Sequence, residues 1–189
     1  MNVRSTRRFS QAISEGDGIS VVADVQSIEE ARRAADAGAD ALLVRVQTAL
    51  AGTPELPVLS RALEAAASSD ALLLEPGAWD DEGLAKRYGE IVDGGAECVV
   101  EVRDEEQLER VLELLDPEIL MLAGAEDADD RLEAVLDLLP DVPAGKLVVA
   151  DVGGAGQAAV AGLERVGVDA VIVAVADVAA LVGDEPPDV

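Results

Sequence analysis

Four carboxylates stand at or near the ends of short apolar segments of this sequence. Asp24 ends the segment VVAD, Glu75 ends ALLLE, Glu101 lies in ECVVEV and Asp151 ends LVVAD. Carboxylates that lie close together raise one another's pKa, which suits general acid–base chemistry, and they also bind hard divalent cations. These residues therefore predict either a proton-transfer site or a cation site, provided that the fold brings the segment ends together.

The same carboxylates also have plainer interpretations. They can cap the helices that follow them, or pair with Arg45 and Arg103, which occur at similar positions. The chain has no histidine and a single cysteine, Cys98 in an apolar segment. This composition excludes an internal disulfide, histidine-dependent triads and imidazole metal ligands. We therefore predict no resident metal and no cofactor, with a divalent cation on the four carboxylates kept as an alternative.

A glycine cluster follows the last of these acids, in LVVADVGGAGQ at 147–157. It does not fit G-x-G-x-x-G, and no Lys-Ser/Thr pair follows it, so it indicates neither a dinucleotide fingerprint nor a P-loop. Two interpretations remain: a phosphate held by free backbone N–H groups before a helix, or a tight turn between a strand and a helix.

The elements that would position these residues alternate along the chain. Apolar segments predict strands at 19–25, 41–46, 71–75, 97–102, 118–124, 146–152 and 170–175. Amphipathic segments at 27–38, 80–95, 104–115 and 129–140 predict helices, several of which open with Ser or Asp followed by Glu. The strands are apolar on both faces, which is typical of a parallel sheet covered by helices.

This order predicts an α/β fold, a (β/α)8 TIM barrel of minimal length, with catalytic groups at the carboxyl ends of its strands. Seven strands are clear, so a seven-stranded incomplete barrel and an open α/β sheet remain alternatives. The segment LPVLS at 56–60 is either an eighth, short strand or part of a helix over 54–69. We expect one compact domain over 1–189, with a polar, proline-containing tail at 184–189 that is frayed.

The charge of the chain restricts its partners. With 39 acidic and 14 basic residues, the formal net charge is −25, which argues against nucleic acid and anionic membranes as partners. An anion site must therefore be local. No apolar segment approaches the roughly 20 residues that cross a bilayer, so we expect a soluble cytoplasmic protein. The acidity suits a high-salt cytoplasm or an Ala/Arg/Asp-rich genome, and nothing predicts the oligomeric state.

Three segments resemble one known family, the indole-3-glycerol phosphate synthases of tryptophan biosynthesis. RRFSQAISEGDGISVVADVQS is similar to its first helix and strand, and ECVVEVRDEEQLERVLEL to its fifth strand and helix. KLVVADVGGAGQAAVAGLERVGVDAVIVAVADV is similar to its seventh and eighth strands. The resemblance covers roughly 7–180 and is strongest over 97–176. It implies an eight-stranded barrel with 56–60 as a trimmed third strand, and a carbon–carbon (carboxy-) lyase acting on a small phosphorylated substrate.

The resemblance also implies roles for individual residues. Asp24, Glu101 and Asp151 fall at the family's acid–base positions, and Arg61 falls near a catalytic lysine of its third strand. Gly153 falls at the phosphate-binding glycine, and we place the phosphate against Gly153 and Gly154.

The chain departs from the family pattern at several of its functional positions. Gln26 replaces a lysine, Val152 replaces a serine, and Ala174-Val175 replaces a Gly-Glu/Ser pair. A shortened, diverged member is therefore expected. The alternative is a minimal non-catalytic barrel that binds a small phosphorylated ligand or none.

Overall fold

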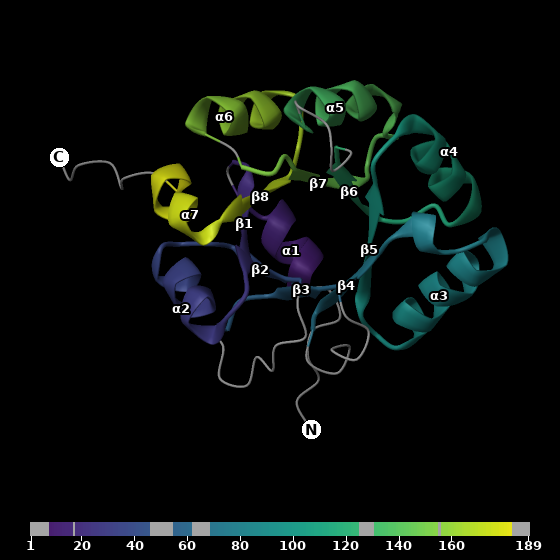
Figure 1. Ribbon diagram of the computed structural model, residues 1–189, viewed down its shortest axis with the longest axis horizontal. Helices are drawn as coiled ribbons and strands as arrows, with labels where there is room; N and C mark the ends of the chain where they lie inside the picture. The colour runs from purple at the N-terminus through teal and green to yellow at the C-terminus, as the bar shows by residue number, and fades with distance from the viewer. Residues whose placement is uncertain are drawn as a thin grey trace.

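The computed structural model describes residues 8–16, 18–45, 55–61, 69–124, 131–154 and 156–182. Eight parallel strands form a closed barrel in the order β1-β2-β3-β4-β5-β6-β7-β8 (Figure 1). The strands are β1 Ser20–Val25, β2 Ala41–Val44, β3 Val58–Ser60, β4 Ala71–Leu74, β5 Glu97–Val102, β6 Ile119–Ala123, β7 Leu147–Asp151 and β8 Ala170–Ala174. The predicted TIM barrel is confirmed, and the seven-stranded and open-sheet alternatives are wrong.

The third strand decides the question that the sequence left open. Residues Val58–Ser60 pair with β2 on one side and β4 on the other, so 56–60 supplies the eighth strand and not part of a helix. Residues 62–68, the rest of the alternative helix, lie outside the described residues, as does the predicted tail at 184–189. Three residues are enough for β3 because both of its neighbours complete its hydrogen bonds.

Helices cover the outside of the barrel between successive strands. They are α2 Ile28–Asp36, α3 Asp81–Asp93, α4 Glu105–Leu114, α5 Arg131–Leu138, α6 Gln157–Arg165 and α7 Val175–Leu181, with short 3-10 turns at Pro76–Ala78 and Leu139–Asp141. The predicted start signals work as caps: Ser27, Asp80 and Asp104 accept hydrogen bonds from the third residue beyond them. No described helix is both long and apolar enough to cross a membrane.

Helix α1, Arg8–Ser14, closes the amino-terminal end of the barrel. It lies across the barrel axis in Figure 1, and Phe9 and Ile13 pack into the interior cluster with residues such as Val22 and Met121. Glu97 at the start of β5 accepts hydrogen bonds from the backbone N–H groups of Phe9 and Ser10. The barrel interior is therefore a packed core at this end, and space for a ligand is left at the other.

Three aspartates form hydrogen bonds to strand backbones at the amino-terminal end of the barrel. Asp40, Asp70 and Asp169 each precede a strand, and each accepts a hydrogen bond from the backbone N–H of Val21, Val58 and Val148 respectively. Burial raises the pKa of Asp169, while its hydrogen bond from Val148 acts in the opposite direction. These carboxylates hold neighbouring strands together, and they lie at the opposite end of the barrel from the candidate site.

Candidate functional site

A ring of residues, one per strand, lines the carboxyl-terminal mouth of the barrel. Side chains two residues apart on a strand share a face, so the residue two beyond each interior apolar side chain also faces the barrel axis. The ring consists of Asp24, Arg45, Arg61, Glu75, Glu101, Ala123, Asp151 and Ala174. All four carboxylates singled out in the sequence therefore belong to one layer, directly above the apolar core.

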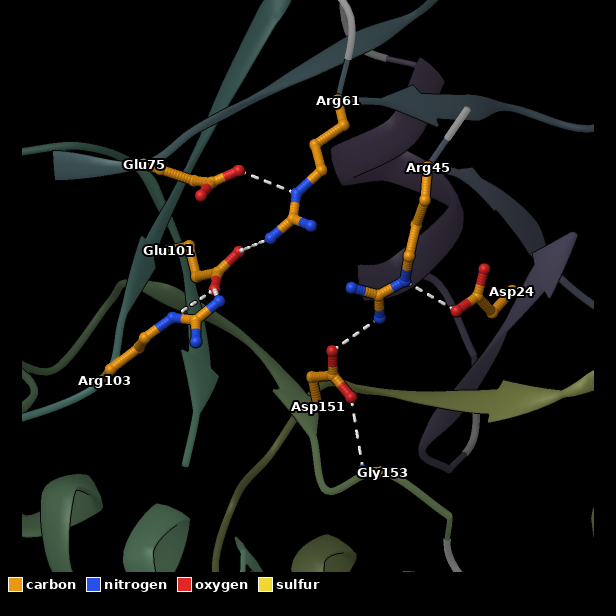
Figure 2. A network of polar contacts seen from close by, with 8 residues as sticks. All are labelled: Asp24, Arg45, Arg61, Glu75, Glu101, Arg103, Asp151 and Gly153. Carbon is orange, nitrogen blue, oxygen red and sulfur yellow. Dashed lines mark hydrogen bonds and ion pairs between the residues drawn. The ribbon is translucent and has the colours of Figure 1, made fainter. Parts of the chain in front are cut away.

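Glu101 is the centre of one ion-pair group, which we call the Glu101 cluster (Figure 2). Its Oε2 lies 3.2 Å from Nη2 of Arg61, and its Oε1 accepts a 2.7 Å hydrogen bond from Nε of Arg103. Arg61 Nε in turn lies 2.7 Å from Oε1 of Glu75. Glu101 is 2% exposed, and two guanidinium groups compensate its burial.

Arg45 forms the second group, the Arg45 bridge, with Asp24 and Asp151. Its Nε donates to Oδ2 of Asp24 and its Nη2 to Oδ2 of Asp151, both at 2.6 Å (Figure 2). Burial acts to lower the pKa of Arg45, but the hydrogen bonds and charges of Asp151 and Asp24 outweigh it and raise that pKa above its usual value. Arg45 therefore stays a cation and joins β1, β2 and β7.

These contacts show that the four carboxylates form ion pairs with arginine, which was one of the alternatives to a proton-transfer or cation site. Arg61 forms such ion pairs in addition to the expected Arg45 and Arg103. Within the described residues, no group of three or more His, Cys, Asp or Glu side chains is placed to hold a metal ion. The alternative of a divalent cation on Asp24, Glu75, Glu101 and Asp151 is therefore not supported, because arginine nitrogen atoms lie between these carboxylates.

A cavity of about 930 Å³ opens beside these groups. This volume lies within the usual range of small-molecule sites. Ala123 and Ala174 contribute small side chains to the ring, and the cavity runs past them and past Ile172. Asp24, Glu30, Glu101 and Asp151 line it together with Arg33, Arg45, Arg103 and Arg131. Four carboxylates and four guanidinium groups balance, so the cavity is close to neutral in a chain of net charge −25.

Arg131, the first residue of α5, lines this cavity, and the sequence reasoning missed it. A Cβ at Gly124 would lie 3.0 Å from Cα of Arg131, and a Cβ at Gly153 would lie 3.0 Å from its Nη1. Gly153 has a φ of +71°, which also favours glycine. The two glycines thus leave the space that Arg131 occupies. The only signal in the sequence was a glycine at the end of one predicted strand, Gly124, and another directly after a second predicted strand, Gly153.

The other predicted site residues divide into two sets. Gly153 and Gly154 line the cavity with Asp24, Glu101 and Asp151, whereas Arg61 is not among the lining residues. The Gly153 N–H donates to Oδ1 of Asp151 at 3.2 Å, so the glycine cluster is a tight turn that carries an internal hydrogen bond. Arg33 and Glu30 of α2 also line the cavity and were not expected there.

Neither lysine of the chain lies in this cavity. Lys86 is on the exposed side of α3, and Lys146 precedes β7 and pairs with Asp116 at the amino-terminal end of the barrel. Cys98 is buried, as expected from its apolar segment, and burial raises the pKa of its thiol to about 12. The polar groups that line the cavity are therefore carboxylates, guanidinium groups, the side-chain amide of Gln26 and backbone N–H groups.

Comparison with known structures agrees with this architecture. N-acetylmannosamine-6-phosphate 2-epimerase from Clostridium perfringens superposes with a TM-score of 0.68, covering 92% of both chains at 10% identity. GGGPS from Thermoplasma volcanium gives a TM-score of 0.64, covering 96% of this chain and 94% of that one, also at 10% identity. The chain is a TIM barrel. At this identity the likeness concerns the fold alone.

Sequence comparison adds a partial relationship. No family model matches the chain. The indole-3-glycerol phosphate synthase of Geobacillus sp. (strain WCH70) is 34% identical over 110 residues, and that of Variovorax paradoxus (strain S110) is 38% identical over 114 residues. The matches cover 56% and 57% of this chain, but only 42% and 41% of those enzymes. The TIM barrel thus carries partial similarity to these synthases over about two-fifths of their length.

Proposed function

We propose that this TIM barrel binds a small phosphorylated ligand in the cavity at the mouth of the barrel, without the lysine-dependent condensation of an indole-3-glycerol phosphate synthase. The observation that carries the proposal is the position of Arg131. Its guanidinium group packs against Gly153 on the wall of the cavity, where Gly154 also lies. An arginine beside glycine backbone N–H groups matches the geometry and the charge of a phosphate.

Electrostatics support a local binding site in this cavity. The net charge of −25 repels a phosphorylated ligand at long range. Inside the cavity four guanidinium groups offset four carboxylates, and interactions at this depth are screened less than at the surface. The balance therefore provides a local site where an anion is tolerated.

The names of similar proteins support the ligand class. Both sequence relatives are named for indole-3-glycerol phosphate, and the epimerase is named for a sugar 6-phosphate. Arg131 would hold the phosphate beside Gly153 and Gly154, and the alanines of the ring, Ala123 and Ala174, would contact the rest of the ligand.

The ion pairs argue against the condensation itself. Glu101 and Asp151 are each bonded to arginine, and a guanidinium group remains protonated at neutral pH and is a poor proton donor. Arg61, near the position of a catalytic lysine in the family, is held between Glu75 and Glu101. The residues that would transfer protons thus form ion pairs that link the strands at the mouth of the barrel.

One observation favours a second candidate, a lyase of the indole-3-glycerol phosphate synthase type. Asp24, Glu101 and Asp151 line a single cavity, and Oδ1 of Asp24 is buried without a hydrogen-bond partner among the described residues. The Asp24 carboxylate would be the proton acceptor of such an enzyme, with Glu101 and Asp151 as the other acid–base groups and Arg61 as an electrostatic substitute for lysine.

Two measurements on the intact chain test these candidates. The anilino-deoxyribulose phosphate substrate of the family is titrated by calorimetry and then incubated while indole fluorescence is followed. Binding without turnover, at low and at high salt, supports the binding role. Turnover above background would establish the lyase, and absence of binding of both this compound and inorganic phosphate would refute the proposal.

Replacement of Arg131 tests whether this residue binds the phosphate in the cavity. Arg131→Gln removes a charged hydrogen-bond donor, and we expect the affinity for inorganic phosphate to fall about tenfold or more. Arg165→Gln is the matched control, because Arg165 is exposed at the end of α6 and the change in net charge is the same. An equal loss in both variants would show that only the overall charge matters.

A further inference from the structure

The carboxylate of Asp151 already occupies the Gly153 N–H, one of the groups proposed to hold the phosphate. Its Oδ1 accepts the Gly153 N–H at 3.2 Å, and its Oδ2 accepts Nη2 of Arg45 at 2.6 Å. Asp151 is 6% exposed at the end of β7, only two residues before Gly153. It thus lies as an internal anion next to the place proposed for the phosphate (Figure 2).

Arg45 does not cancel the charge of this anion. The same guanidinium group also bonds Asp24, so the Arg45 bridge consists of two carboxylates and one cation and carries a net charge of −1. Both carboxylates line the cavity. A ligand phosphate at Gly153 therefore meets the positive charge of Arg131 and, from the Arg45 bridge, an excess of negative charge.

We infer that Asp151 determines the charge of the anion that the cavity accepts, because it competes with the ligand for the Gly153 N–H and repels the ligand by its charge. This inference rests on the proposed phosphate site. The repulsion scales with the charge of the ligand, so a dianionic phosphate monoester is disfavoured more than a singly charged phosphoryl or sulfuryl ester of the same shape. Among phosphorylated ligands of similar shape, the cavity accordingly favours the one whose phosphoryl group carries the lower charge.

The test uses two probes of similar shape and different charge, methyl phosphate and methyl sulfate. At about pH 8 methyl phosphate is a dianion, since its second pKa is near 6, whereas methyl sulfate is a monoanion. Affinities for wild type and Asp151→Asn are measured by titration of amide NMR shifts, which also locates the anion at Gly153 and Gly154. We expect the substitution to raise affinity about tenfold for methyl phosphate and about threefold for methyl sulfate, because the Coulomb energy doubles with ligand charge.

Two further variants separate charge from hydrogen bonding. Asp151→Asn keeps an acceptor for the Gly153 N–H, whereas Asp151→Ala also releases that donor, so the alanine variant should gain a further, similar factor for both probes. Asp93→Asn is the control for net charge, because Asp93 is exposed at the end of α3 on the opposite side of the barrel. It should leave both affinities unchanged.

The outcomes distinguish this inference from the proposed function. Equal gains for the two probes, or no gain, would overturn the role of the Asp151 charge while phosphate binding stands. If neither probe nor inorganic phosphate binds wild type or any variant, both the proposed function and this inference fail. Should the variants not fold, wild type decides: tighter binding of methyl sulfate than of methyl phosphate supports the inference, and tighter binding of methyl phosphate contradicts it.

Discussion

Nη2 of Arg45 lies 2.6 Å from Oδ2 of Asp151, and this contact joins β2 to β7 across the mouth of the barrel. Two strands, β1 and β8, lie between them in the barrel order. The Arg45 side chain can reach Asp151 because the ring residue of β8 is Ala174, whose small side chain does not block the path. The same contact thus ties distant parts of the chain together and places a charge beside the cavity.

Arg45→Met should destabilise the protein through these ion pairs. Methionine keeps most of the volume, but Asp24 and the buried Asp151 lose their shared cation. We expect the free energy of unfolding, measured in urea, to fall by about 2–3 kcal/mol, somewhat less than for a fully buried pair because Arg45 is partly exposed.

The control for this variant is Arg33→Met, because Arg33 also lines the cavity but is largely exposed, with one long contact to Glu30. That substitution should change stability by less than about 0.5 kcal/mol. If the two variants lose the same amount, Arg45 has no special role in holding the strands.

The barrel and the chain positions of its acids were predictable from local pattern. Apolar segments alternating with amphipathic helices indicate βα units, and the parallel order places residues such as Asp24 and Glu101 at one end. The short strand Val58–Ser60 was not decided, because three residues carry too little periodicity and their pairing depends on β2 and β4.

The contacts of the site could not be predicted in the same way. Arg45 and Asp151 are 106 residues apart, and their contact depends on barrel closure and on the length of one side chain. Arg131 precedes no strand and follows none directly, and its position depends on the space left by Gly124 and Gly153. Sequence pattern gives the face on which a side chain lies, but it does not give the partner that the side chain reaches.

Cys98 should be nearly inert towards alkylation in the folded protein. Burial raises the pKa of its thiol from 9.0 to about 12, and the thiolate is the reactive species. At about pH 8 iodoacetamide should therefore modify it at least about 1,000-fold more slowly than in urea, because the two pKa values differ by about three units.

The same pKa shift predicts a pH dependence of stability. The folded state holds the thiol proton between pH 9.0 and about 12 while the unfolded state releases it, so this contribution is complete below pH 9.0 and is lost as the pH rises towards 12. Cys98→Ser should lack this part of the decline in unfolding experiments. Rapid alkylation of the folded protein would contradict the buried position of the thiol.

Ala174 offers a test of the cavity that leaves the ion pairs intact. Its side chain is exposed at the end of β8 and lines the cavity. Ala174→Leu should fill part of this space and lower the affinity for a phosphorylated ligand larger than inorganic phosphate, such as the anilino-deoxyribulose phosphate, by about tenfold or more, as expected for a steric block within a mostly preformed pocket.

The thermal midpoint of Ala174→Leu should stay close to that of wild type, because an exposed position tolerates the added volume. Ala179→Leu on the exposed side of α7 is the matched control, and it should affect neither binding nor stability. Inorganic phosphate tests the phosphate-binding residues separately from the ring alanines. If Arg131, Gly153 and Gly154 hold the phosphate by themselves, inorganic phosphate should still bind Ala174→Leu. Unchanged binding of the larger ligand to Ala174→Leu would place that ligand outside this cavity.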